Sequence, residues 1–278
     1  MIQVENIDFG YRKRRMYQGF SLSIDQGGIY GILGTNGTGK STLLKLITGL
    51  LFPSKGNCKV FNRISSRRLP DFLSSVYLLP EEIDTPQGTV LKYAKNIATF
   101  YPKFSLSDFE KLMISFDVKA SDKFSQMSYG QKKKAMIAVA LASHSEVILL
   151  DEPTNGLDIP SKSQFRKSMS EFVNDDQIVL ISTHQVRDLD MLLDRIILLN
   201  EGKLLVNNSV SEIESRLVMK RVSSTEGFAN LLYAEQGLQG IEVIYPNADK
   251  EDSRLNLETF FNAVIQHETT ILNQLNSK

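Results

Sequence analysis

The nine residues Gly34-Thr35-Asn36-Gly37-Thr38-Gly39-Lys40-Ser41-Thr42 carry the pattern Gly-x4-Gly-Lys-Ser. A short apolar run at 29–33, typical of a buried strand, precedes them, and a helical pattern at 42–51 with Leu50 on its buried side follows. Glycines let backbone N–H groups turn inward around phosphate oxygens, because side chains obstruct the conformations that this requires. Strand, glycine loop and helix in this order predict a phosphate-binding loop rather than a plain glycine turn.

The loop also supplies side chains suited to a nucleoside triphosphate. Lys40 offers a positive charge to the β- and γ-phosphates, and Ser41 offers a hydroxyl to magnesium. The helix that follows aims its positive end at the same anion. The candidate nucleotide contacts in the loop are Gly34, Asn36, Gly37, Gly39, Lys40, Ser41 and Thr42.

Two acids follow a second apolar run. Asp151 and Glu152 come directly after Val147-Ile148-Leu149-Leu150, at the carboxyl end of a predicted central strand, where open α/β sheets place ligands. Adjacent residues of an extended chain point in different directions, so we expect different roles. Asp151 suits the magnesium shell, and Glu152 suits a base that orients and polarises the attacking water. Solvated strand-end acids are the alternative, which the phosphate loop disfavours.

The order of elements predicts an α/β fold. Val4, Leu22 and Ile24 lie in short alternating segments that indicate antiparallel strands at the N-terminus. Apolar runs at 75–79, 147–150, 178–182 and 195–199 are separated by helical stretches, which predicts a mostly parallel sheet covered on both faces. The predicted α/β fold, with a mostly parallel core around the phosphate loop and an antiparallel N-terminal β subdomain, resembles a P-loop NTPase core.

Two further regions depart from this alternation. Residues 84–145 show helical starts, such as a capping box at Ser107-Asp108-Phe109-Glu110, and are predicted to be a helical insertion. Beyond the main domain at 1–215, strands at 217–222 and 241–245 and a helix at 255–265 predict a small α+β appendage at 216–278. Ser209 is expected to cap a short helix before it.

Composition excludes several classes of protein. The 32 basic residues balance 32 acidic ones, so no global field favours nucleic acid or an anionic membrane. The single Cys58 excludes an internal disulfide framework and fits a reducing, cytosolic setting. The start lacks the regions of a signal peptide, and no apolar run approaches the ~18 residues of a membrane helix. We expect that any membrane-spanning part belongs to another chain.

With a third motif, Met127-Ser128-Tyr129-Gly130-Gln131 at the start of a helix, the chain resembles the ATP-binding cassette (ABC) ATPases over residues 1 to about 205. The loop at 34–42 matches Walker A, 127–131 the signature, 147–152 Walker B and 153–158 the D-loop. His184 lies at the place of the switch histidine. Tyr11 lies at the place of the aromatic residue that stacks on adenine, with packing against the nearby sheet as the alternative.

The resemblance implies a head-to-tail dimer that hydrolyses ATP with Mg²⁺. ATP in the loop of one subunit would be closed over by Ser128, Gly130 and Gln131 of the other, with Asp158 also at the nucleotide. Ser128 would cap a helix at about 130–143 whose free N–H groups form an anion site. We expect at least two residues of Lys132-Lys133-Lys134 to be a solvated basic face. His184 would contact the γ-phosphate, whereas a lone histidine elsewhere is more often structural.

Two departures from the family pattern stand out. Met127 and Tyr129 replace the leucine and glycine of Leu-Ser-Gly-Gly-Gln, and Glu81 replaces a glutamine that reaches magnesium and the γ-phosphate. A carboxylate also binds magnesium, so Glu81 joins Ser41 and Asp151 as a candidate ligand. A surface acid beside Glu82 is the alternative for Glu81. Lys40, Glu152 and His184 are the candidate catalytic residues.

The resemblance implies an ATP-binding and ATP-hydrolysing subunit of a membrane transporter. Phe100-Tyr101-Pro102-Lys103-Phe104 and the stretch at 257–261 are similar to the antibiotic-efflux and exporter branch. Such a subunit forms a homodimer or heterodimer and lies at the cytoplasmic face of the membrane. It contacts a separate permease through a groove beside the helical insertion. The alternative is a soluble ABC ATPase without a permease, acting in translation, DNA repair or cluster assembly, although the charge predicts no nucleic-acid contact.

Overall fold

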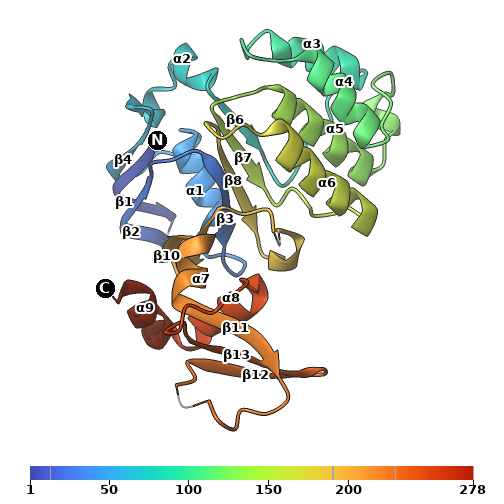
Figure 1. The fold of residues 1–278 in the computed structure, drawn as a ribbon. Coiled ribbons are helices and arrows are strands. Elements are labelled where there is room, and N and C mark those ends of the chain that lie inside the picture. The colour runs from blue at the N-terminus through green and yellow to red at the C-terminus, as the bar shows by residue number, and fades with distance from the viewer. Residues whose placement is uncertain (13, 190, 229, 278) are drawn as a thin grey trace.

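The computed structural model describes residues 1–12, 14–189, 191–228 and 230–277, which include a six-stranded central sheet of order β10-β9-β3-β8-β7-β6 (Figure 1). All of its strands except β10 run parallel, which confirms the prediction of a mostly parallel sheet. The strands are β3 (Gly28–Leu33), β6 (Val76–Leu79), β7 (Val147–Asp151), β8 (Ile178–Thr183), β9 (Arg195–Asn200) and β10 (Lys203–Ser209). Among the described residues, no helix has the length and apolar character needed to cross a membrane.

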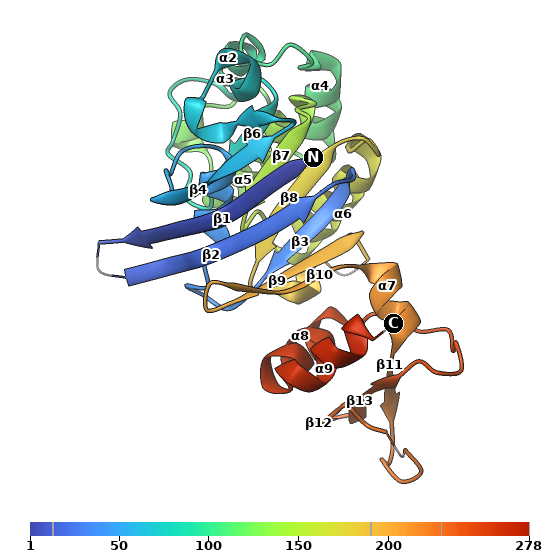
Figure 2. The ribbon, with the colours of Figure 1, turned by 90° about the vertical axis from the view of Figure 1, so that its left-hand side faces the viewer.

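An antiparallel sheet of order β2-β1-β4-β5 packs beside the central sheet, as predicted for the N-terminus. Helix α1 (Lys40–Ile47) lies between the two sheets (Figure 1) and buries four apolar side chains there. Figure 2 shows β1 and β2 side by side across this face of the molecule. The strands are β1 (Ile2–Tyr11), β2 (Arg14–Ile24), β4 (Lys55–Val60) and β5 (Arg63–Ile64).

The predicted helix at 42–51 is wrong at both ends. α1 starts at Lys40 and ends at Ile47, and the backbone of Gly49 then turns into the left-handed region with φ of 66°. A glycine in this conformation ends a helix at little steric cost. Leu50 lies beyond this turn and is 49% exposed, so its predicted place on the buried side is also wrong.

Helices cover the opposite face of the central sheet. The central helix of this layer is α5 (Tyr129–Ala142), whose residues from Ala135 onward are all buried. Around it lie α3 (Val90–Ala98), α4 (Leu106–Ser115), the 3₁₀ turn η2 (Phe124–Gln126) and α6 (Ile159–Phe172). Between β5 and β6 lie η1 (Ser65–Arg67) and α2 (Pro70–Leu73).

The capping box predicted at Ser107 is wrong by two residues. The side chain of Ser105 accepts the N–H of Asp108 at 3.1 Å and caps α4. Asp108 instead directs its carboxylate to Lys111 and His144, at 2.9 Å each. Both serines offered a hydroxyl, and these tertiary partners of Asp108 are not visible in the local sequence.

The C-terminal part forms a smaller antiparallel sheet of order β11-β13-β12 beyond β10 (Figures 1 and 2). The strands predicted at 217–222 and 241–245 and the helix at 255–265 are confirmed, as is the cap at Ser209. The sequence did not reveal β12 or α9. The elements are α7 (Val210–Arg216), β11 (Leu217–Val222), β12 (Tyr233–Gly237), β13 (Gly240–Pro246), α8 (Leu257–Gln266) and α9 (Glu268–Asn276).

Candidate nucleotide site

The glycine loop connects β3 to α1 at the carboxyl end of the central strands. Gly37 and Gly39 have φ of 80° and 111°, a region that side chains disfavour. A Cβ on Gly39 would lie 2.4 Å from the Tyr17 hydroxyl, which donates to the Gly39 carbonyl at 2.8 Å. Both the backbone conformation and the space around it therefore require glycine at position 39.

Lys40 lies at the base of the loop. Its ammonium donates to the carbonyl oxygens of Gly34 at 2.8 Å and Thr35 at 3.3 Å. It also lies 3.7 Å from Oε1 of Glu152. Burial lowers the pKa of Lys40, while Glu152, Asp151 and Glu81 oppose that shift, so the surrounding acids help to keep the ammonium charged.

Asp151 pairs with hydroxyl groups. Its Oδ1 accepts hydrogen bonds from Ser41 Oγ at 3.0 Å and from Ser182 Oγ at 2.5 Å. The described residues contain no group of three or more His, Cys, Asp and Glu side chains placed to hold a metal. Mg²⁺ does not require such a group, because proteins often bind it through one or two carboxylates, with water and substrate phosphates completing the shell. The Ser41–Asp151 pair fits this chemistry.

Glu152 leaves the line of β7 and meets other partners. Its φ is 45°, an uncommon value for a residue with a side chain, and its N–H donates to the Ser182 carbonyl at 3.1 Å. Its Oε1 lies 2.8 Å from Nδ1 of His184. The side chain is 5% exposed, so a buried carboxylate lies between the lysine and the histidine. The two adjacent acids thus have different partners.

Lys40, Ser41, Glu152 and His184 line one cavity of about 360 Å³, whereas Asp151 is not among its lining residues. Its lining brings together Met16, Asn36, Gly37, Gly39, Lys40, Ser41, Thr42, Glu81, Glu152 and His184. The loop, Glu81, Glu152 and His184 come from separate segments, and more than a hundred residues separate the loop from Glu152 and His184.

Tyr11 lies at the edge of this site. Its hydroxyl is 3.3 Å from Oγ1 of Thr42, and its ring meets Phe9 edge-on at a centroid distance of 5.0 Å. The residue is 45% exposed, which leaves ring surface for a base. Both sequence interpretations, stacking on adenine and packing on the sheet, are compatible with this placement.

The signature residues do not line the cavity. Ser128 accepts the Gln131 N–H at 3.2 Å, and the Gln131 side chain accepts the Ser128 N–H at 2.9 Å, which makes a capping box at the start of α5. Asp158 caps α6 by accepting the Ser161 N–H at 2.9 Å. Within one chain, none of Ser128, Gly130, Gln131 and Asp158 therefore lines the cavity that holds Lys40.

Sequence reasoning missed two cations at this site. Arg14 on β2 donates from Nη2 to the Gly37 carbonyl at 3.1 Å, and only the β1–β2 pairing brings it there. Lys133 is fully buried and so differs from the solvated basic face expected around it. Neither contact has a local sequence signal, since each depends on tertiary structure.

The fold and the glycine loop define an α/β protein that binds a nucleoside triphosphate in a P-loop. A family model described as ABC transporter matches residues 17–155, which is half of the chain, and the chain therefore belongs to that family. It is an ATPase and the ATP-binding and ATP-hydrolysing subunit of an ABC transporter.

Curated relatives agree with this assignment. The ABC transporter ATP-binding protein YtrB of Bacillus subtilis is 26% identical over 90% of this chain and 88% of its own. The linearmycin resistance ATP-binding protein LnrL of the same species is 27% identical, over 78% of this chain and 72% of its own. A solved ATP binding subunit of an ABC transporter covers 77% of this chain and 92% of its own at a TM-score of 0.68 and 23% identity, which shows the fold.

Proposed function

We propose that this chain energises the export of a substrate through a separate membrane permease, by ATP-driven dimerisation. One observation carries the proposal. Lys40, Glu152 and His184 line one cavity, whereas Ser128 and its capping box begin a helix outside it. A second subunit is needed to bring a signature helix to the phosphates.

Hydrolysis requires an attacking water, a base and a stabilised phosphate. We assign the loop N–H groups and Lys40 to the β- and γ-phosphates. Mg²⁺, held by Ser41 and Asp151 with Glu81 within reach, would neutralise charge on those phosphates. Glu152 accepts the proton of the water that attacks the γ-phosphorus, as the bond to the β–γ bridging oxygen breaks and ADP leaves. His184, held against Glu152, would contact the γ-phosphate.

The signature helix supplies the closing face. The first N–H groups of a helix lack intrahelical partners and attract anions. Ser128, Gly130 and Gln131 would approach the γ-phosphate on the other subunit, with Asp158 beside them. Ile159, directly after Asp158, is 83% exposed, and a large exposed apolar side chain at this place suits a surface that a second subunit covers.

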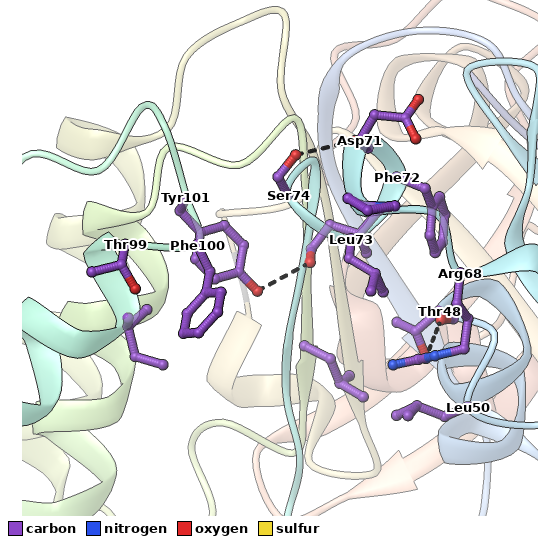
Figure 3. A pocket seen from close by; sticks show the side chains of 14 residues that line it. Thr48, Leu50, Arg68, Asp71, Phe72, Leu73, Ser74, Thr99, Phe100 and Tyr101 are labelled. Carbon is purple, nitrogen blue, oxygen red and sulfur yellow. Dashed lines mark hydrogen bonds between the residues drawn. The ribbon is translucent and has the colours of Figure 1, made fainter.

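A mostly apolar groove lies where the permease would dock. It has a volume of about 750 Å³ (Figure 3). Figure 3 shows Phe100 and Tyr101 on one side of it and Leu50 and Phe72 on the other. Phe100 is 69% exposed and Leu50 is 49% exposed, so the groove presents apolar surface to a partner. We assign it to a short helix of the permease.

The position of the groove connects docking to chemistry. Val76 and Leu78 of β6 line it, and the same strand leads directly to Glu81 at the nucleotide cavity. A permease segment in the groove would therefore lie against β6, the strand that leads to Glu81, a candidate magnesium ligand. We therefore propose that the chain lies at the cytoplasmic face of the membrane, beside the permease.

Export is the direction that the relatives favour. LnrL is named for linearmycin resistance, and BcrA of Enterococcus faecalis, 29% identical over 78% of this chain, is named for bacitracin transport. We infer that this chain serves an exporter of the same branch.

The test is to express tagged Glu152→Gln in the native host, solubilise membranes with ATP present and identify the proteins that copurify. We expect a protein with several membrane spans in stoichiometric amount. Lys40→Ala, which should not hold ATP, is the control and should recover less of it. Recovery only in the soluble fraction, with a ribosome or another soluble assembly, would overturn the proposed partnership with a permease.

A further inference from the structure

The main-chain oxygen of Glu81 is held by two side chains of α5. The Tyr129 hydroxyl donates to it at 3.1 Å and the Lys133 ammonium donates at 3.0 Å. Tyr129 and Lys133 are four residues apart on one helix and therefore share a face. Two donors on one carbonyl oxygen satisfy both of its lone pairs.

Lys133 is an unusual group to bury. The residue is 0% exposed, and burying an ammonium is costly unless it is hydrogen-bonded and compensated by opposite charge. Burial lowers the pKa of Lys133, and Glu81, Asp151 and Glu152 act in the opposite direction. The cation therefore offsets the negative charge of three acids at the nucleotide site.

The Tyr129 ring is fixed from another side. A Cβ on Gly156, whose φ is 78°, would lie 2.6 Å from two carbons of that ring, so the ring fills the space over the turn. Asn155, the residue before this glycine, donates from Nδ2 to Oε1 of Glu81 at 3.0 Å. The backbone and the carboxylate of Glu81 are thus each held, by α5 and by the turn that packs on Tyr129.

We propose that Tyr129 and Lys133 form a clamp that positions the Glu81 carboxylate toward the metal side of bound MgATP. They are positioning residues, since they act through Glu81 and do not line the nucleotide cavity. The clamp also joins the two sites of the dimer, because Tyr129 lies between Ser128 and Gly130, which serve the partner's nucleotide. This inference rests on the proposed function for its ligand, and it deepens the role of Glu81.

The decisive variant is Tyr129→Phe, which removes one hydroxyl and keeps the ring over Gly156. Binding of ATP is measured by calorimetry in the Glu152→Gln background, once with Mg²⁺ and once with a chelator. We expect MgATP to bind about two- to tenfold more weakly, the range for loss of one ordinary hydrogen bond, while metal-free ATP binds as before. Tyr30→Phe is the control, since its hydroxyl donates to the Gln26 carbonyl at 2.8 Å.

A double-mutant cycle shows whether the effect passes through Glu81. Adding Tyr129→Phe to Glu81→Ala should cause no further loss of MgATP affinity. An unchanged MgATP affinity, equal weakening of both forms of ATP, or full additivity with Glu81→Ala would each overturn the clamp. Failure of the nucleotide site itself would look different, because the parent would then bind no ATP.

Discussion

At the scale of single residues, the contrast between Asp151 and Glu152 matters most for the chemistry. Asp151 ends β7 and accepts hydrogen bonds from Ser41 and Ser182. Glu152 takes a left-handed backbone conformation that turns its carboxylate between Lys40 and His184. One residue of sequence thus separates a carboxylate suited to a metal from one suited to a base.

Glu152→Gln should therefore keep ATP binding and lose turnover by about 10²- to 10⁴-fold, the usual contribution of a positioned base. An amide can accept a hydrogen bond, but it cannot take the proton of the attacking water at neutral pH. Phosphate release and equilibrium ATP binding are the measurements. Hydrolysis at the parent rate would show that another group is the base.

The sequence predicted much of this site because its motifs are local. The spacing within the glycine loop identifies Lys40 and Ser41, which we assign to the phosphates and magnesium of the nucleotide. It did not predict Arg14 or Lys133, whose contacts with Gly37 and Glu81 depend on how distant segments pack. Burial of a lysine within a run of three has no signature in the run itself.

At the scale of elements, the start of α5 combines two roles. Ser128 caps the helix and belongs to the surface that we assign to the dimer. Ser128→Arg should still bind ATP in its own loop but should not dimerise, since a bulky cation would occupy the closing face. Ser105→Arg is a matched control that removes the cap of α4 instead. Loss of either cap should cost about 1 kcal/mol of stability.

Sedimentation with ATP separates these two variants. Equal dimerisation of Ser128→Arg and Ser105→Arg would contradict the assignment of the start of α5 to the dimer surface. If both remain monomeric, the loss reflects a damaged cap rather than the closing face.

Strand β4 gives a prediction about Cys58. Burial raises the pKa of this thiol to about 12, and the residue is 4% exposed. At pH 8 only about one Cys58 side chain in 10⁴ is then a thiolate, which is the form that reacts. The native protein should therefore react slowly with a thiol reagent. Unfolded protein should react at once, with one equivalent. Rapid labelling of the native chain would contradict the packing of β4.

Helices and strands were predicted correctly where the sequence carries a clear apolar pattern. The core strands β7, β8 and β9 are short apolar runs because both faces of a parallel sheet are buried. β12 was missed because four of its five residues are exposed, and its sequence Tyr-Ala-Glu-Gln-Gly shows no such run. Pairing with β13 makes it a strand.

At the scale of the whole molecule, helix α8 of the C-terminal part meets the main body close to His184. The 3₁₀ turn η3 (Val186–Leu189) follows His184 closely, and α8 packs against it. Arg187 of η3 pairs with Glu258 of α8 at 2.5 Å. The appendage therefore contacts the segment that holds a candidate catalytic side chain.

Arg187→Glu should lower the ATPase rate about two- to fivefold. The substitution removes one weak contact that holds η3, the turn next to His184, against α8. Stability should change by less than about 1 kcal/mol, since the two side chains are 77% and 43% exposed and form a surface ion pair. The charge-swapped double variant with Glu258→Arg should recover the rate. An unchanged rate in the single variant would separate the appendage from the switch segment.

The central claim is that two chains close over ATP, and sedimentation velocity of Glu152→Gln tests it most directly. With MgATP this variant should sediment as a dimer, and without nucleotide, or with Ser128→Arg added, as a monomer. The wild-type ATPase rate per chain should rise with protein concentration over the same range. A Glu152→Gln chain that stays monomeric with ATP bound, beside a wild-type rate independent of concentration, would contradict the account.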